Sequence, residues 1–580
     1  MKRFLCFLTF VFYPLVATAE IQLIGQIYKA DGRAPTITHV HLTNISFSHQ
    51  FNPILSVQAN KDGKFILHLP KAGLYRLWIS APNHLRIAIP LIIQEEDEVV
   101  NLEITLAPNL LKETLDEVEI IGDWNDFDIA KAEPMQKMSD GTFVYEREVS
   151  KETVAYQLVG IDRWSTDINL PYSITSLYNY VTGINISNRS LNGTMSDYYI
   201  YDENGNYRSI LRVKPGKVKI VFYPQEISRT SATNLPKLSY DEGHQYLEKF
   251  FEISQEYNKM IWKHRQAAEA YIRKHETLEG FTFPASDCRK FLKKVMQEED
   301  PRGTREFAAV HLAALAWFEG VGVDSTEHKR ILEIAPPTSP FWGIDPYLPP
   351  SVAKTQVEGR NESIISEFLN KNPNRLVRAF ALSHLIEKAA LEGDKQRTQE
   401  LYKELNANYS DVKEVEFTLK RFDPNRNILV AQPVPDFELK LIGSEERVSN
   451  KSLLGKYYLI DFWAVWCAPC VAEMPLLHSV YGKFRNFNFE ILSLSLDASV
   501  EDVEKFRTKK KWKMPWLNAF VRGGFQNKIV QNFDVLGIPK PILVNPDGII
   551  VATEEELRGE NLEKTLAKYL GDVASRTSQN

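Results

Sequence analysis

The chain has 580 residues, a formal net charge of −6 and four cysteines. This length is too great for one hydrophobic core and predicts three to five domains of roughly 150 residues each. The acidic balance gives no reason to expect a nucleic-acid partner, and so few cysteines exclude a scaffold held together by disulfides.

Residues 1–19 have the pattern of a secretory signal peptide. Lys2 and Arg3 precede a short apolar run, and residues 17–19 read Ala-Thr-Ala, a small-x-small cleavage site. We expect cleavage after residue 19 and a periplasmic or cell-envelope location, with an uncleaved signal that anchors the protein as the alternative. Cys6 lies inside the apolar run and is expected to be removed with it.

Residues 20–110 alternate between apolar and polar side chains and are divided by Asp-Gly turns, which predicts a β-sandwich. The Asp-Gly turns are residues 31–32 and 62–63, and the expected strands are residues 21–28, 39–45, 64–69, 74–79, 87–93 and 99–106. The order of strands and turns resembles the carboxypeptidase-regulatory-like, prealbumin-type sandwich. That resemblance implies a spacing or binding role rather than catalysis.

A second β-sandwich is predicted for residues 115–225. The Asp-Trp-Asn-Asp turn around Trp124 and the strand at 143–149 resemble the early-set sandwich of glycogen-binding modules. In such modules exposed aromatic rings stack on sugars, so Trp124 and Trp164 are candidate contacts for a glycan. The alternative is that Trp124 packs in a loop or core.

From residue 240 to 425 the apolar period becomes helical, and we predict a helical bundle. An apolar face repeats at Tyr246, Phe250, Ile253, Tyr257 and Ile261. Further helices are expected at 290–296, 305–318, 361–369, 373–391 and 394–405. The last two form a helical hairpin that resembles the tetratricopeptide type, although no repeat with a dependable period follows. Cys288 is expected to be a buried small side chain.

Prolines at 433 and 435 end the helical region and open an α/β domain at residues 433–575. Its central motif is Trp-Cys-Ala-Pro-Cys, with Cys467 and Cys470 expected on the first turn of a helix. The helix amide groups and dipole should stabilise a thiolate on Cys467. A zinc site would need further ligands nearby and covalent haem a histidine after the second cysteine, so we predict a redox-active Cys467–Cys470 pair with no metal and no further cofactor.

The Pro-Asp-Phe opening at 435–437 and the strand that leads into the two cysteines resemble the TlpA-like branch of the thioredoxin superfamily. The expected order after the CxxC helix is a strand at 489–496, a helix at 500–509, strands at 542–544 and 549–552, and a helix at 562–570. The long interval before Pro539 leaves room for the additional strand and helix of this branch.

The resemblance also implies site residues. Pro539 matches the cis-proline that faces the CxxC pair, and Ile538 would offer backbone groups to an extended substrate. Trp466 would flank the reactive sulfur. Asp461 matches the buried acid of thioredoxin and Glu473 the acid of the CxxCxxE pattern, and either could accept the proton of the second cysteine. The alternatives are a carboxylate held in hydrogen bonds for Asp461 and an exposed helix face for Glu473.

This sequence departs from thioredoxin where a lysine accompanies the buried acid, because the aligned position falls near Ser493. The predicted reaction is thiol-disulfide exchange: Cys467 attacks and Cys470 resolves the mixed disulfide. Ala468 and Pro469, between the cysteines, resemble reducing members of the superfamily. The expected partners are protein thiols and disulfides and an upstream electron donor, for which a membrane thiol transporter is a candidate.

Two other classes of function stay open. One is a thiol peroxidase, because peroxiredoxins share the Pro-Asp-Phe opening; their nucleophile follows a threonine that is absent before Cys467. The other is an envelope-binding or scaffold protein that recognises a glycan or protein through the upstream domains and carries an accessory redox domain.

Overall fold

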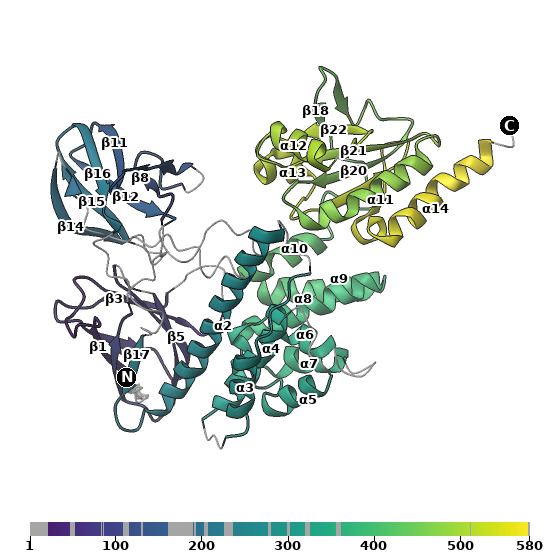
Figure 1. Ribbon diagram of the computed structural model, residues 1–580. Coiled ribbons are helices and arrows are strands. Elements are labelled where there is room, and N and C mark those ends of the chain that lie inside the picture. Colours follow the sequence, from purple (N-terminus) through teal and green to yellow (C-terminus); the bar gives the residue numbers. More distant parts are fainter. Residues whose placement is uncertain are drawn as a thin grey trace, which may run out of the picture. The chain divides into compact units, whose positions relative to one another are not determined.

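Figure 1 shows the computed structural model of the chain and labels its helices and strands. The structure describes residues 21–46, 53–82, 84, 86–107, 115–128, 131–160, 189–190, 193–201, 207–224, 236–275, 280–298, 302–319, 325–354, 361–510 and 512–577. The predicted signal peptide and Trp164 lie outside these ranges. The chain divides into two compact units, Met1–Arg378 and Ala379–Asn580. The helices predicted between residues 240 and 425 therefore belong to both units.

The first β-rich region of the N-terminal unit consists of β1 (Ile21–Tyr28), β2 (His39–Asn44), β3 (Leu55–Gln58), β4 (Lys64–Leu69), β5 (Gly73–Ser80), β6 (Ile87–Ile93), β7 (Val99–Thr105) and β17 (Lys237–Tyr240). One sheet has the order β17-β7-β1-β4 and another the order β3-β2-β5-β6. Buried and more exposed side chains alternate along β1 and β4, as a strand with one face toward a core requires. The six predicted strands are confirmed, and β3 and β17 add to them.

The second β-rich region consists of β8 (Glu119–Gly122), β9 (Glu133–Pro134), β10 (Gln136–Lys137), β11 (Phe143–Val149), β12 (Thr153–Val159), β13 (Arg189–Ser190), β14 (Gly193–Tyr201), β15 (Tyr207–Val213) and β16 (Gly216–Phe222). The sheet orders are β10-β11-β16-β13 and β14-β15-β12-β8-β9. Phe143 and Ile220 from the first sheet share one apolar core with Ile120 and Tyr156 from the second.

Trp124 packs against this core. Its ring stacks on Tyr145 with 5.4 Å between the ring centroids, and the guanidinium carbon of Arg147 lies 5.1 Å from the Trp124 ring. These contacts support the packing alternative for Trp124 over an exposed sugar contact.

The helices of the N-terminal unit are α2 (Tyr246–His275), α3 (Ser286–Val295), α4 (Thr304–Glu319), α5 (Ser325–Ile334), η3 (Pro340–Ile344), α6 (Leu348–Lys354) and α7 (Asn361–Lys371), and α8 (Arg375–Leu391) crosses the division. On α2 the predicted apolar face is confirmed, because Phe250 and Ile253 are fully buried. Cys288 in α3 is buried, as expected. None of the helices in the described ranges is long and apolar enough to cross a membrane.

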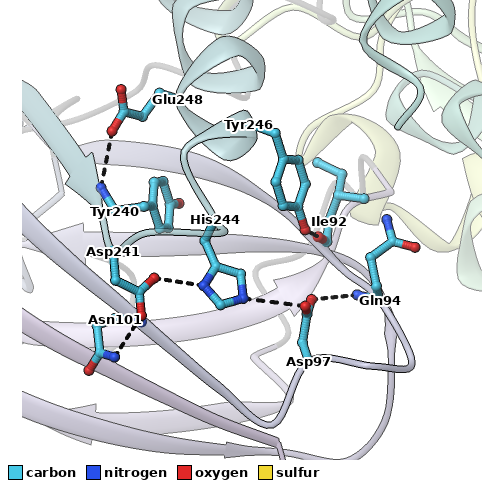
Figure 2. A network of polar contacts seen from close by, with 9 residues as sticks. All are labelled: Ile92, Gln94, Asp97, Asn101, Tyr240, Asp241, His244, Tyr246 and Glu248. Atoms are coloured by element: carbon cyan, nitrogen blue, oxygen red, sulfur yellow. Dashed lines mark hydrogen bonds and ion pairs between the residues drawn. The ribbon is translucent and has the colours of Figure 1, made fainter. Parts of the chain in front are cut away.

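The start of α2 is tied to the first β-rich region by polar contacts, which Figure 2 shows. The His244 ring lies between two carboxylates: Nδ1 is 2.6 Å from Asp241 Oδ1 and Nε2 is 3.3 Å from Asp97 Oδ1. The Tyr246 hydroxyl donates a hydrogen bond of 2.9 Å to the carbonyl oxygen of Ile92. The bonds to Asp97 and Ile92 join residues about 150 positions apart and fix where the helix begins.

The C-terminal unit continues with α9 (Lys395–Tyr409), η4 (Lys413–Val415), α10 (Glu416–Phe422), β18 (Glu438–Lys440), β19 (Arg447–Ser449), β20 (Tyr457–Trp463), α11 (Ala468–Phe484), β21 (Phe489–Ser495), α12 (Val500–Lys510), β22 (Leu517–Phe520), η5 (Gly524–Gln526), α13 (Lys528–Asn532), β23 (Lys540–Val544), β24 (Ile550–Thr553), η6 (Glu554–Leu557) and α14 (Glu560–Thr577). The element order predicted after the two cysteines is confirmed. β22 and α13 occupy the interval in which an additional strand and helix were expected.

A mixed sheet with the order β22-β21-β20-β23-β24 is the centre of this α/β region. β20 is parallel to β21 and antiparallel to β23. Its side chains alternate between two cores: Tyr458 and Phe462 belong to one, whereas Leu459 and Trp463 belong to the other together with the two cysteines. This period of two places Asp461 on the face that carries the cysteines.

Candidate functional site

Cys467 and Cys470 form a disulfide at the N-terminus of α11. Cys467 is the N-cap residue, and its Sγ accepts a hydrogen bond of 3.2 Å from the backbone N–H of Cys470. Pro469 fits the first turn because the N–H groups there have no partner within the helix. The same N–H group and the positive end of the helix dipole would stabilise a thiolate at Cys467 after reduction.

The two cysteines differ little in burial, but their neighbour is exposed. Cys467 is 5% exposed and Cys470 2%, whereas Trp466 is 52% exposed. The Trp466 ring lies near that of Phe525 in η5, with 6.4 Å between the centroids. Trp466 therefore presents an apolar surface beside the disulfide.

A loop with a cis peptide bond between Ile538 and Pro539 faces the disulfide. The carbonyl oxygen of Ile538 lies 3.6 Å from Cys467 Sγ. The cis geometry matches what the family resemblance implies for Pro539. The structure thus brings Trp466, Ile538 and Pro539 to the surroundings of Cys467, which a substrate disulfide or thiol must approach.

Asp461 is 5% exposed and lies on the central strand β20, on the sheet face that shares a core with the cysteines. Its pKa is raised to about 7, mainly because of burial; the nearby charge of Glu473 also raises the pKa, and the guanidinium of Arg558 lowers it. On the neighbouring strand Asp461 pairs with Ser493, the residue near which the resemblance places the lysine of thioredoxin. Serine carries no charge at that position, and burial is the largest influence on the pKa of the Asp461 carboxyl group.

The alternative for Glu473, an exposed helix face, is not what the structure shows. The Glu473 side chain is 23% exposed, and its Oε1 accepts a hydrogen bond of 3.0 Å from Arg558 Nε. Arg558 comes from the segment between η6 and α14, 85 residues away in the sequence. Sequence patterns carry no local signal for such a partner, and Arg558 was not predicted.

Asp497 is a second residue that sequence reasoning missed. Its Oδ1 accepts a hydrogen bond of 3.0 Å from the backbone N–H of Val465, and its Oδ2 accepts one of 2.8 Å from the Ser495 hydroxyl. Asp497 is 3% exposed, and burial raises its pKa. Because Val465 lies two residues before Cys467, Asp497 holds the backbone that leads into the redox pair. Its position directly after the mainly apolar run at 489–496 is the signal that could have identified it.

Comparisons with known proteins place the similarity in the C-terminal unit. The AhpC/TSA family model matches residues 430–553. The thiol-disulfide oxidoreductase ResA of Oceanobacillus iheyensis is 30% identical over 155 residues, which is 26% of this chain and 77% of that protein. ResA of Bacillus cereus is 28% identical over 161 residues, 27% of this chain and 88% of that protein.

Among solved structures, the thioredoxin domain of a thiol-disulfide oxidoreductase from Bacteroides vulgatus is 30% identical to this chain. The match covers 25% of this chain and 99% of that one, with a TM-score of 0.23.

Proposed function

Because the chain belongs, through residues 430–553, to the thioredoxin-like thiol-disulfide oxidoreductases similar to ResA, we propose that it reduces disulfides in proteins outside the cytoplasm. The observation that carries this proposal is the Cys467–Cys470 disulfide on the first turn of α11, facing the loop of Ile538 and cis-Pro539. The pair is itself the redox group, and the proposal includes no further cofactor.

The reaction starts from the dithiol form of the pair. The Cys467 thiolate attacks one sulfur of a substrate disulfide; a bond forms between the two sulfurs as the substrate S–S bond breaks, and the other substrate sulfur leaves and takes up a proton. Cys470 then loses its proton and attacks Cys467 Sγ, which releases the first substrate sulfur as a thiol. The substrate gains two electrons and two protons, and Cys467 and Cys470 lose them.

Local geometry supports these roles for the two cysteines. Cys467 caps α11 and accepts the Cys470 N–H, so its thiolate is the better stabilised of the two. Backbone groups of Ile538 beside Cys467 could pair with an extended substrate segment in the manner of an added strand.

Asp461 is the proposed acceptor of the Cys470 proton. A carboxyl group whose pKa is about 7 can exchange a proton near neutral pH, whereas one with an ordinary aspartate pKa is a poor base there. Glu473, held by Arg558, would act on the same step through its charge beside Asp461 or as a second acceptor.

We propose the reducing direction because Ala468-Pro469 between the cysteines resembles reducing members of the superfamily. An upstream donor would then return two electrons to the disulfide, and a membrane thiol transporter is the candidate class. The pattern of residues 1–19 supports export to the periplasm or cell envelope. The two β-rich regions, proposed as sandwich modules, would select a protein or glycan partner.

Insulin reduction tests the proposal directly. Wild type should reduce insulin disulfides with dithiothreitol as the electron source, and Cys467→Ser should lose this activity completely. Cys470→Ser should instead accumulate a mixed disulfide through Cys467, and mass spectrometry of that adduct from cell-envelope extracts would identify the substrate. Equal activity of wild type and Cys467→Ser would instead favour a scaffold with an accessory redox domain.

The peroxidase alternative is not favoured. The relatives reported above are named thiol-disulfide oxidoreductases, and the residues before Cys467 lack the threonine of a peroxiredoxin site. Reduction of peroxide by the wild type with dithiothreitol as the electron donor, in the absence of any disulfide substrate, would revive it.

A further inference from the structure

A helix outside the family-matched segment lies beside the loop that carries cis-Pro539. Phe417, on α10, is 47% exposed. A methyl group placed on the Cα of Gly537 would lie 3.9 Å from the Phe417 ring. Gly537 directly precedes Ile538, whose carbonyl oxygen lies 3.6 Å from Cys467 Sγ. The exposed ring of Phe417 is thus close in space to the loop that contacts the reactive sulfur, although Phe417 lies 50 positions before Cys467 in the sequence.

Charged contacts hold α10 in this position. Arg421 lies one helical turn after Phe417 on the same face, and its Nε donates a hydrogen bond of 3.1 Å to Glu554 Oε2. The other oxygen of Glu554 pairs with Lys540, the residue that follows Pro539. Burial raises the pKa of Glu554, but Lys540 and Arg421 outweigh it and lower the pKa overall. The chain Arg421–Glu554–Lys540 therefore links α10 directly to the active-site loop.

More apolar surface lies on the other elements around the disulfide. Trp466 is 52% exposed and Phe525 is 37% exposed, and their rings are neighbours. Large aromatic side chains that stay exposed beside a reactive group indicate a binding surface, because burying them on a partner is favourable.

We propose that Phe417 extends the substrate-binding surface, and that the substrate is a polypeptide with an apolar side chain close to its cystine. The inference rests on the proposed function. A small disulfide can reach Cys467 without approaching α10. A polypeptide that pairs with the Ile538 backbone advances about 3.3 Å per residue, so a side chain one or two residues from its cysteine would reach Phe417.

The test compares three substrates with the full-length protein. Two are synthetic peptides with one intramolecular disulfide that differ only in carrying Leu or Ser two residues before the first cysteine, and the third is a small aromatic disulfide. Wild type should reduce the Leu peptide with a kcat/KM about tenfold higher than the Ser peptide, the lower end of the range for one extra apolar contact. Phe417→Ala should lower kcat/KM for the Leu peptide to that of the Ser peptide and leave the small disulfide unaffected.

Two further variants separate binding from folding. Phe417→Leu should keep most of the preference, because an apolar side chain remains. Phe487→Ala removes a comparably exposed aromatic side chain (40%) near the opposite end of α11 and should leave all three rates unchanged.

The outcomes separate the two proposals. An unchanged preference in Phe417→Ala, with activity still abolished by Cys467→Ser, would overturn the role of Phe417 and keep the proposed function. An equal loss on all three substrates would also overturn it and mark Phe417 as structural. If wild type reduces none of the three, both proposals fail.

Discussion

Asp461 combines burial with two opposing charges nearby. Its pKa of about 7 lies well above the ordinary value of 3.8, because burial disfavours the carboxylate and the charge of Glu473 adds to this, while Arg558 partly offsets both. The protein keeps this carboxyl group in its core although a neutral side chain would pack there at lower cost. A group that costs stability but can exchange a proton near pH 7 is what the resolving step requires.

The first prediction concerns stability. With its pKa raised in the folded state, Asp461 keeps its proton between pH 4 and 7 while the unfolded chain has lost it, so unfolding releases a proton and the free energy of unfolding falls as pH rises. This loss of stability is absent below about pH 3.8 and complete above about pH 7. At about 1.4 kcal/mol per pKa unit, it amounts to at most about 4 kcal/mol.

Asp461→Asn imitates the protonated group and should remove this dependence. Urea unfolding of both proteins between pH 4 and 8 should show similar stability at pH 4 and a stability advantage of the variant that grows up to about pH 7 and is then constant to pH 8. A constant difference between the two proteins across this range would contradict the raised pKa.

The second prediction uses the two charges next to Asp461. Glu473→Gln removes the charge that raises the pKa of Asp461, and Arg558→Ala removes the charge that lowers it. The measured quantity is the rate of single-turnover insulin reduction by the pre-reduced protein as a function of pH. The midpoint that reports Asp461 should be absent in Asp461→Asn. It should move to lower pH in Glu473→Gln and to higher pH in Arg558→Ala.

Lys483→Ala supplies the matched control. Lys483 on α11 pairs with Glu563 on α14 at 2.7 Å, so it joins these helices on an exposed surface, and its loss should not move the profile. Shifts of Glu473→Gln and Arg558→Ala in the same direction would show that the two residues act through structure rather than through their charges.

The site residues that were predicted from the sequence share one property: each belongs to a short motif of neighbouring residues. Cys467, Cys470 and Glu473 lie within seven positions, and Pro539 follows a recognisable Gly-Ile pair. Arg558 reaches Glu473 from 85 residues away, and Phe417 reaches the Pro539 loop from outside the family-matched segment. Such contacts depend on the folded chain, and a single sequence holds no periodicity or spacing that reports them.

At the scale of elements, strands and helices with a regular apolar period were predicted well. Buried and more exposed side chains alternate along β1 and β4, and β20 is a continuous buried run from its second residue on. The helix α9 begins after Asp394, whose side chain accepts a hydrogen bond from the N–H of Arg397, as expected of an N-cap residue. β3 was missed because its four residues are all partly or fully exposed. β17 was missed because it joins β7 across more than 130 residues, and that pairing leaves no local pattern.

The third prediction concerns the junction between α2 and the first β-rich region (Figure 2). His244→Ala would leave the carboxylates of Asp97 and Asp241 without the ring between them, and Asp97 is only 8% exposed. We expect a loss of about 1–3 kcal/mol in the stability of the N-terminal unit, measured by urea unfolding, with insulin reduction unchanged.

Arg33→Ala is the control for this junction. It breaks the pair with Asp31 on the surface of the same region, where Arg33 is 77% exposed, and should leave the unfolding midpoint in place. If His244→Ala unfolds no more easily than Arg33→Ala, the polar contacts of Figure 2 do not hold α2 in place.

At the scale of the whole molecule, the division at Arg378 and Ala379 cuts α8 rather than a linker. The proline-rich stretch at 433–435, which the sequence marks as a boundary, lies inside the C-terminal unit. Prolines report where a helix must stop, whereas a compact unit is defined by contacts between segments distant in the sequence. The helices α9 and α10 therefore belong with the redox region, which is why α10 can contribute to its substrate surface.

The fourth prediction follows from this division. Units with separate sets of contacts unfold as separate cooperative blocks, so calorimetry of the full chain should show two transitions rather than one. Because His244 and Asp461 lie in different units, His244→Ala should lower the temperature of one transition only. At pH 8, Asp461→Asn should raise the temperature of the other transition only, since it removes the buried charge. A single transition whose calorimetric and van't Hoff enthalpies agree, and which both variants move, would show instead that the chain unfolds as one block.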